Sequence, residues 1–314
     1  LINPITTDLA RKMQLNPTKD DNLDTMTICD VLASSPRKKG YRISEINNFE
    51  FYEQKRLTRE HHDLKEQLNV YTNKLQKCID IVFPEYNSLF KSKYGTVYMK
   101  VLKAFGCADS IAHADIRNIR KCFETNRNGR TISLTPEKLK EAAKHSIGFP
   151  SKAEVIEIRH LIDLIELIKE QINDVDIKIE EFSTQLNSPI LTIPGISHFS
   201  GTSILAELGD LRNYSKASQI IKFAGVSPYK HQSSQYEAQH TAITKKGSRY
   251  LRKTLYQVIL PVIRYNPVFN KYYHLKLSQG KGHRCAQGHC VRKLLRIIYH
   301  LVITNQPFDS TLLK

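Results

Sequence analysis

Two aspartates near the beginning of the chain have the spacing of a pair of metal ligands. Asp21 and Asp24 lie three residues apart in a segment that predicts a helix, so both carboxylates would project from one face. Carboxylate oxygens suit Mg²⁺, and paired Mg²⁺ ions would polarise a phosphate and activate an attacking oxygen. Taken alone, these residues favour a simpler interpretation, an acidic first turn that complements the helix dipole.

A polar loop in the last third of the chain has the residues to hold a phosphodiester beside a hydroxyl group. Ser233 and Ser234 are adjacent in it, and a serine hydroxyl there could attack phosphorus. Basic residues and the turn into a helix follow: Lys245, Lys246, Gly247, Arg249 and Arg252. Their charges would stabilise a developing phosphorane. Adjacent serines are common in loops, so the pattern by itself favours a plain polar loop.

A third motif indicates contact with a nucleic-acid backbone. Pro194, Gly195 and Ile196 separate a short predicted helix from a second one that begins with small residues, which resembles a helix-hairpin-helix element. In such an element, N–H groups of the turn and of the next helix N-terminus meet a DNA phosphate without reading sequence. The alternative is an ordinary helix–turn–helix packing unit.

Composition and charge restrict the class of protein. The chain has 314 residues, of which 40% are hydrophobic, so it can bury a core and is not a disordered tail. No apolar run reaches the roughly 18 residues that a membrane span needs. The net charge of +16 favours a polyanionic partner. Residues 191–314 hold 18 Lys and Arg against four acids, a net charge of +14, which assigns the polyanion-binding part to this region.

The cysteines give little evidence of a metal site. The six cysteines form no CxxC pair and no framework of a small secreted domain, which favours a reducing cytoplasm. His283, Cys285, His289 and Cys290 lie close together, but their spacing fits no common zinc template. We interpret them as the start of a basic helix.

The middle of the chain is predicted to form long helices. Apolar residues recur at steps of three and four over residues 158–182, and residues 57–82 follow a looser version of this rule until Phe83-Pro84 ends the helix. Two helices that pack antiparallel within one chain explain the pattern, and so does a seam that also pairs two protomers. Strand-like alternation is scarce, so the predicted fold class is mostly α.

In this order, the motifs resemble the insertion-sequence transposases of the IS one-ten family. Asn3-Pro4 and residues 18–24 are similar to the end of the family's DEDD-type nuclease domain, and residues 194–309 are similar to its transposase domain. The resemblance implies three regions: residues 1–40 as the C-terminal part of an RNase H/RuvC-like α/β domain, residues 41–188 as a helical coiled-coil region, and residues 189–314 as an α-rich transposase domain with the helix-hairpin-helix element.

The resemblance also implies roles for single residues. Asp21 and Asp24 match the last two acids of the tetrad and would hold half of a two-metal Mg²⁺ site. The family's serine nucleophile precedes a glycine, and counting from the flanking landmarks gives Ser233, with Ser234 in place of that glycine and as the backup nucleophile. The first two acids of the tetrad are not in this chain. We therefore expect a fragment of a longer enzyme that is inactive alone.

The expected function is that of a DNA transposase or recombinase that cuts and rejoins strands through a metal-assisted serine. The resemblance further implies a structured guide RNA, a homo-oligomer of two to four chains, and a cytoplasmic, membrane-free location in a bacterium or archaeon. The expected DNA contacts are Pro194, Gly195, Ile196, Lys245, Lys246, Gly247, Arg249 and Arg252. Two alternatives stay open: a non-catalytic helix-hairpin-helix DNA-binding protein with a coiled-coil dimerisation arm, and a metal-dependent junction nuclease.

Overall fold

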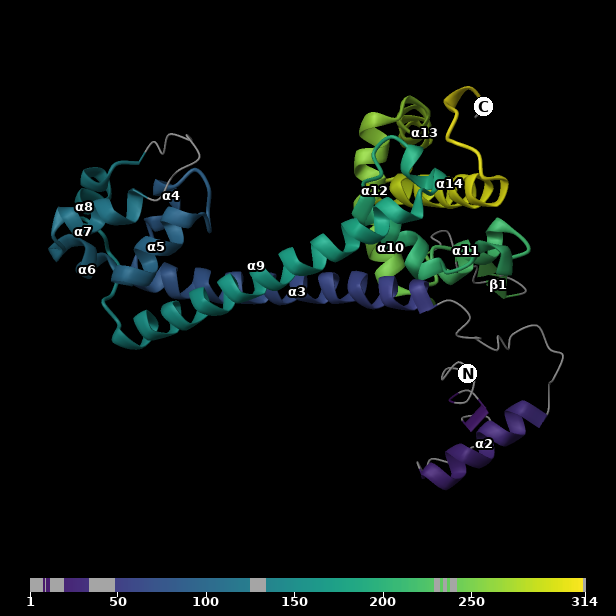
Figure 1. Cartoon of the computed structure of the whole chain (residues 1–314), viewed down its shortest axis with the longest axis horizontal. Helices are drawn as coiled ribbons and strands as arrows, with labels where there is room; N and C mark the ends of the chain where they lie inside the picture. Colours follow the sequence, from purple (N-terminus) through teal and green to yellow (C-terminus); the bar gives the residue numbers. More distant parts are fainter. Residues whose placement is uncertain are drawn as a thin grey trace. The chain divides into compact units, whose positions relative to one another are not determined.

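The computed structural model of the chain describes residues 8, 10–11, 20–33, 49–124, 134–228, 232–233, 236–237 and 242–312. Contacts divide the chain into two compact units, Leu1–Tyr52 and Glu53–Lys314. The expectation of a mostly helical chain is confirmed, because the described residues contain many α-helices and only two strands, each of two residues (Figure 1). Within this described part, no helix is both long and apolar enough to cross a membrane.

The first unit contains helix α2 (Asp21–Ala33). The helix begins after Asp20, whose carboxylate accepts a hydrogen bond from Asn22 N at 3.1 Å and so satisfies one of the free N–H groups of the first turn. Thr27 and Val31 lie one turn apart and are both buried. The buried face of α2 is therefore narrow, and most of its other side chains are exposed.

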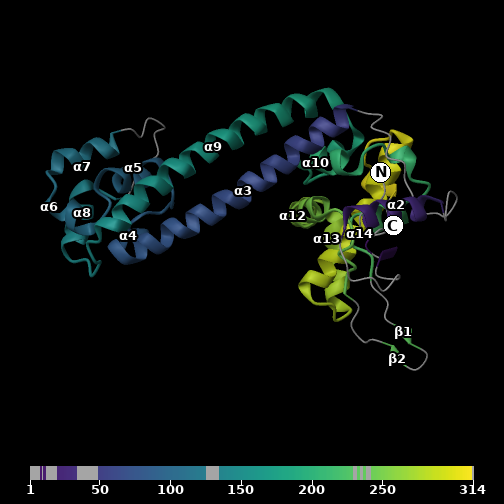
Figure 2. The ribbon, with the colours of Figure 1, turned by 90° about the horizontal axis from the view of Figure 1, so that it is seen from below.

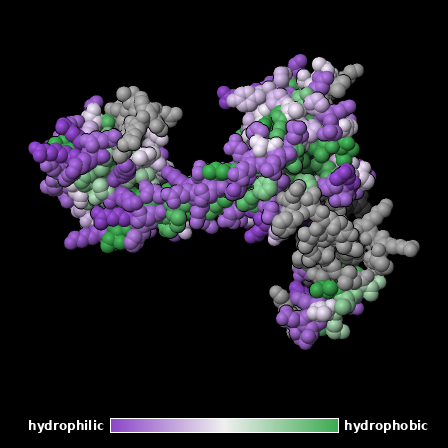
Figure 3. All heavy atoms as spheres, viewed as in Figure 1, coloured by the Kyte–Doolittle hydropathy of each residue, from purple (hydrophilic) through white to green (hydrophobic). Residues whose placement is uncertain are grey.

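Two long helices of the second unit form an antiparallel hairpin that we call the arm: α3 (Phe49–Val82) and α9 (Lys152–Leu186) (Figures 1 and 2). Apolar side chains at heptad spacing meet along the seam. Those near its midpoint are Leu64, Leu68, Tyr71, Ile168, Ile172 and Val175. Hydrophilic side chains cover much of the visible surface of the arm (Figure 3). Of the two explanations for the heptads, pairing within one chain is present in the structure.

Shorter helices follow α3 and pack at the end of the arm where α9 begins. They are α4 (Tyr86–Leu89), α5 (Thr96–Phe105), α6 (Ala108–His113), α7 (Ile116–Phe123) and α8 (Pro136–Lys144). Tyr86 is fully buried among them, and its hydroxyl donates a hydrogen bond to Tyr98 O at 2.8 Å. The return into α9 is fixed by Ser151, whose hydroxyl accepts a hydrogen bond from Glu154 N at 3.3 Å.

The elements after α9 form what we call the C-terminal bundle, in which most of the helices pack around a separate core. They are η1 (Pro189–Thr192), α10 (His198–Leu208), η2 (Leu211–Asn213), α11 (Ala217–Phe223), β1 (Gln232–Ser233), β2 (Tyr236–Glu237), α12 (Arg249–Tyr265), α13 (Pro267–Ser278), α14 (His283–Thr304) and η3 (Ser310–Leu312). Helix α14 packs against α11, α12 and α13, and α10 packs against both α9 and α12. The bundle is therefore attached to the arm through α10.

Candidate active site

The acidic pair lies in the first turn of α2. Asp21 is exposed and Asp24 is half-buried. The Arg11 guanidinium lies 3.6 Å from Asp24 Oδ1 and also pairs with Asp8 Oδ1 at 2.9 Å. The oxygen donors suit Mg²⁺, which commonly takes one or two protein carboxylates and completes its shell with water and phosphate oxygens. Among the described residues, the pair belongs to no cluster of three metal-ligating side chains.

Two segments of the C-terminal bundle, residues 223–228 and 243–248, are joined by backbone hydrogen bonds and form what we call the loop base. The bonds run from Thr244 N to Ser227 O at 2.9 Å, from Lys245 N to Gly225 O at 3.0 Å and from Ser248 N to Phe223 O at 3.0 Å. Pro228 and Ile243 add an antiparallel bridge. Pro228 and Ile243, which flank the segment that carries Ser233, are therefore held next to each other.

Glycines permit the close approach of the two segments. Gly247 has a φ of +137°, and a Cβ atom there would lie 2.0 Å from Phe223 O. Gly225 has a φ of +67°, and a Cβ atom there would lie 2.7 Å from Arg252 Nη1. Other residues would be strained at both positions by conformation and by contact. Gly247, expected as a DNA contact, thus also has a structural role at the loop base.

The expected nucleophile lies beyond the loop base. Strand β1 pairs antiparallel with β2 (Figure 2) and ends at Ser233, which stands opposite Tyr236 in the register of the two strands. The side chain of Ser233 lies outside the described residues, as do all of Ser234 and the Asn3-Pro4 motif. The backbone position of Ser233 is therefore all that the structure adds for the expected nucleophile.

The basic residues around the loop base have two different environments. Lys245 and Lys246 are exposed, and so is Arg249 at the first position of α12. The Arg252 guanidinium instead donates hydrogen bonds from Nη1 to Ala224 O at 3.3 Å and to Lys245 O at 3.2 Å. Arg252 thus holds the two sides of the loop base together, while Lys245 and Lys246 present charge to solvent. The Arg249 side chain is 68% exposed but also lies 3.6 Å from Asp63 Oδ1.

The Pro194-Gly195-Ile196 turn contacts the opposite end of α12. Gly195 has a φ of +97°, and a Cβ atom there would lie 2.6 Å from Val262 N. Val262 is 13 residues beyond the first residue of α12, which is about 20 Å along a helix at 1.5 Å per residue. The two expected DNA-contact regions therefore share α12 but lie at its two ends.

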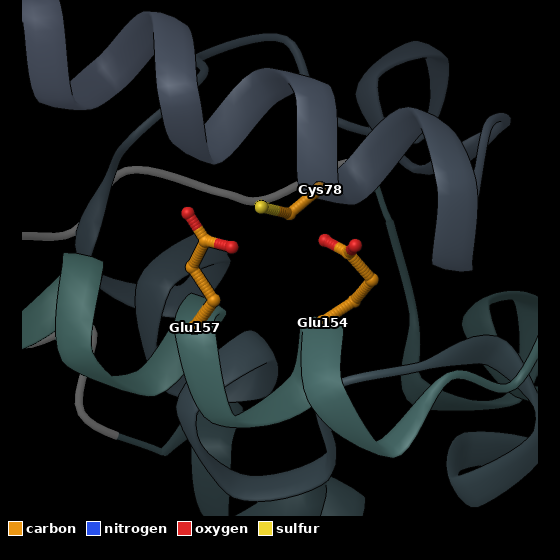
Figure 4. A group of neighbouring side chains, drawn as sticks. All are labelled: Cys78, Glu154 and Glu157. Atoms are coloured by element: carbon orange, nitrogen blue, oxygen red, sulfur yellow. The ribbon is translucent and has the colours of Figure 1, made fainter.

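A group of possible metal ligands outside the expected site lies on the arm. Cys78 of α3 faces Glu154 and Glu157 of α9 (Figure 4), with one ligand atom of each residue within 4.8 Å of the others. Burial, a hydrogen bond donated to Glu154 and the charge of Glu157 raise the pKa of the Cys78 thiol to about 12. The thiol is therefore protonated at neutral pH and serves as a hydrogen-bond donor between the two helices.

The histidine and cysteine group at the start of α14 is engaged in packing. His283 Nδ1 is hydrogen-bonded to the Tyr273 hydroxyl, and its Nε2 lies 2.9 Å from Gln287 Nε2. Cys290 is fully buried in the core of the bundle. Within the described residues, this group does not form a cluster of metal ligands.

Sequence reasoning assigned no role to a set of buried polar residues where the arm meets the bundle. Glu207 of α10 is buried and paired with Arg59 of α3, and His62 Nε2 of α3 lies 2.9 Å from Thr254 Oγ1 of α12. In the sequence these residues belong to amphipathic helices and have no motif spacing. One feature of the sequence could have indicated Glu207: acidic residues are scarce after residue 190, so an acid in this basic region is unusual.

Comparison with known proteins shows that part of this chain is similar to transposases of insertion sequences. Residues 187–274 match the family described as "Transposase IS116/IS110/IS902 family". Over 155 residues, the chain is 31% identical to the "Pilin gene-inverting protein" of Moraxella bovis, and the match covers 49% of this chain and 48% of that protein. Over 182 residues, it is 27% identical to the "Insertion element IS900 uncharacterized 42 kDa protein" of Mycobacterium paratuberculosis, with 56% and 44% covered. The chain spans about half the length of the curated relatives it matches. These matches confirm the resemblance drawn from the motifs.

Proposed function

We propose that this chain is a DNA transposase or recombinase of an insertion sequence, because residues 187–274 match the IS116/IS110/IS902 transposase family. One observation supports this most: the loop base anchors both ends of the Ser233 segment beside exposed basic side chains. Residues 238–308 contain 13 Lys and Arg and no acid. A nucleophile in such a positive field would meet a phosphodiester whose charge is already compensated.

In the proposed reaction, Ser233 Oγ attacks a phosphorus atom of the DNA backbone. A bond forms between the serine oxygen and phosphorus, the bond from phosphorus to the leaving oxygen breaks, the serine proton passes to solvent, and the leaving oxygen takes up a proton. The hydroxyl of another strand then attacks the phosphoserine, which restores the serine and joins the strands. One phosphodiester is broken and one is made, so the exchange needs no nucleoside triphosphate.

Asp21 and Asp24 are the proposed ligands of Mg²⁺ on α2, within part of a RuvC-like domain. Their oxygens fit this ion, and Arg11 holds Asp24 in place until a cation competes for it. When bound, the metal would supply charge stabilisation to the phosphate and to the attacking oxygen.

The proposed DNA contacts form two groups at the ends of α12. Lys245, Lys246 and Arg249 would neutralise phosphates near Ser233, while Gly247 and Arg252 support the backbone that presents them. The turn at residues 194–196, as a helix-hairpin-helix element, would contact a second phosphate group. Their separation of about 20 Å corresponds to about six base pairs at 3.4 Å each, so one duplex can reach both groups.

The proposal extends, by family resemblance, to a structured guide RNA and to an assembly of two to four chains. Positive charge serves RNA and DNA phosphates equally. Ile156, Leu164 and Leu167 of α9 are exposed on the side away from the α3 seam, and they offer an apolar stripe to a second chain.

The test is a covalent protein–DNA adduct. Protein expressed from its complete reading frame is incubated with Mg²⁺ and with DNA that carries the ends of its element, and denaturing gels separate linked from free DNA. Ser233→Ala should abolish the adduct and retain DNA binding, whereas Ser234→Ala should retain both.

Other outcomes identify the alternatives. An adduct lost only in Ser234→Ala would move the nucleophile by one residue, and an adduct kept in both variants would refute the serine mechanism. Cleaved but unlinked ends would indicate a junction nuclease. DNA binding by the unmodified protein without any cleavage would indicate a non-catalytic DNA-binding protein.

A further inference from the structure

A fully buried carboxylate lies where the arm meets the C-terminal bundle. Glu207, near the end of α10, accepts hydrogen bonds from Arg59 Nε at 2.5 Å and Nη2 at 3.1 Å, and its side chain is 0% exposed. Arg59 belongs to α3, so the pair connects residues that are 148 positions apart. Helices α3, α10 and α12 meet at this point (Figure 1). We call this contact the joint.

The joint is charged at neutral pH. Burial alone would raise the pKa of the Glu207 carboxyl, but hydrogen bonds from Arg59 and Ser248 and the charge of Lys55 outweigh it, so the pKa lies below its ordinary value. The Arg59 guanidinium also lies 4.9 Å from the centre of the Tyr250 ring. The Glu207 side chain is fully buried, whereas that of Arg59 is 35% exposed. Replacing a buried ion pair with apolar side chains of similar volume is often neutral for stability, so the hydrogen bonds of Glu207 are of interest for what they position.

The joint connects directly to the loop base. Ser248 Oγ donates a hydrogen bond to Glu207 Oε2 at 2.6 Å and accepts one from Leu251 N at 3.1 Å, which caps α12. The Ser248 backbone N–H donates to Phe223 O across the loop base at 3.0 Å. A continuous set of hydrogen bonds thus runs from Arg59 on the arm, through Glu207 and Ser248, to the segment from which the Ser233 loop begins.

We propose that Glu207 is a positioning residue for the Ser233 loop. Arg59 of the arm holds the Glu207 carboxylate in place. The carboxylate fixes the hydroxyl of Ser248 and with it the N-terminus of α12 and the loop base. The inference rests on the proposed function for its catalytic consequence, since Ser233 is the nucleophile assigned there. The effect on the loop base itself requires no DNA and is measured separately.

Hydrogen–deuterium exchange of the full chain without DNA tests the positioning. The amides of Thr244, Lys245 and Ser248 bond across the loop base and should be protected. In Glu207→Gln and in Ser248→Ala, we expect these amides to exchange about tenfold faster. Loss of a hydrogen bond to a charged group changes the equilibrium between the closed and open loop base by about this factor. Amides in the core of α14 should be unchanged.

Glu66→Gln is the matched control. Glu66 of α3 pairs with Lys253 of α12 at 2.7 Å, so the control removes a carboxylate charge from another contact of α3 with the bundle. The Glu66 side chain is 56% exposed, and exposed pairs contribute little. Exchange at the loop base should not change in this variant.

A double variant separates positioning from stability. Arg59→Met with Glu207→Leu removes both charges and fills the joint with apolar groups, which should preserve the melting temperature. It cannot restore the acceptor for Ser248, so the loop-base amides should still exchange faster. Adduct formation should be slowed while the Kd for DNA is retained.

Two results would overturn the inference. Unchanged loop-base exchange in both Glu207→Gln and Ser248→Ala would show that the joint does not position the loop. Full protection in a folded double variant would show that the joint only fills space. Neither result depends on Ser233, whereas an adduct that survives Ser233→Ala would contradict the proposed function and leave the exchange measurement intact.

Discussion

At the scale of single residues, His62 is a buried histidine at the contact of the arm with the bundle. His62 is 3% exposed, and its Nε2 shares Thr254 Oγ1 with Ser203 Oγ, which lies 3.1 Å from the same oxygen. Burial, together with the positive charges of Lys253 and His61, lowers the pKa of His62 from 6.5 to about 4, although Glu66 and Asp63 oppose the shift. His62 is therefore neutral in the folded protein at neutral pH.

The free energy of unfolding should fall as the pH is lowered from 6.5 towards 4. In this range the unfolded chain binds a proton at His62 and the folded chain does not, so acid favours the unfolded state. The effect of this residue should reach about 2–3 kcal/mol, because one pKa unit corresponds to about 1.4 kcal/mol. Urea unfolding at pH 7, 6, 5 and 4 measures it.

The matched variant for this prediction is His62→Gln, which keeps a polar group near Thr254 and cannot take up a proton. Its unfolding free energy should decline less over the same range than that of the unmodified protein. Parallel pH profiles for the two proteins would contradict the assignment. His145→Gln, which changes an exposed histidine at the end of α8, should follow the unmodified protein.

At the scale of elements, α12 connects the parts of the bundle that carry the expected DNA contacts. Its N-terminus carries the joint and the loop base, and the Gly195 turn packs on its backbone near Pro261. Pro261 lies inside the helix, where its missing N–H leaves a break in the hydrogen-bond ladder. The turn approaches at this position, so a glycine there serves packing in addition to any phosphate contact.

Gly195→Ala should lower the free energy of unfolding by about 2–4 kcal/mol, through strain at positive φ and overlap with α12. Gly280→Ala is the matched comparison, since Gly280 also has a positive φ of +74° at the end of α13, but a Cβ atom there would have no neighbour within 4 Å. It should cost about 1 kcal/mol, from strain alone. Chemical denaturation measures both, and equal losses would show that the approach of the turn to α12 is not tight.

At the scale of the whole molecule, the excess of positive charge is concentrated after residue 190. If this charge binds a nucleic-acid backbone, the affinity should fall linearly on a plot of log K against log salt concentration. Lys245→Ala with Lys246→Ala should reduce the magnitude of this slope by about two, since each lost phosphate contact changes it by about 0.9. Fluorescence anisotropy with a labelled duplex at several salt concentrations measures the slope.

The comparison variant carries Lys121→Ala and Lys138→Ala, which remove two exposed charges from the short helices at the end of the arm. It has the same net charge as the loop-base variant, so the two separate local contacts from the overall field. Equal slopes in the two variants would indicate that the loop base makes no phosphate contacts of its own.

Local patterns in the sequence predict the helical arm, the segregation of charge and the resemblance to a transposase family. Heptads and glycines before helices are local patterns that involve one or two helical turns. The excess of basic residues is found by counting charges along the chain. The same locality explains why the basic residues at the turn into α12 were recognisable from the sequence.

Only the tertiary structure decided which charged residues are buried and which face solvent. Arg252 has the same place in the basic motif as Arg249, yet it bonds to carbonyl groups across the loop base. Glu207 became the centre of the joint because α3 returns past α10 and brings Arg59 to it. Such pairings depend on which helix faces meet, and no spacing along one segment records the position of a partner 148 residues away.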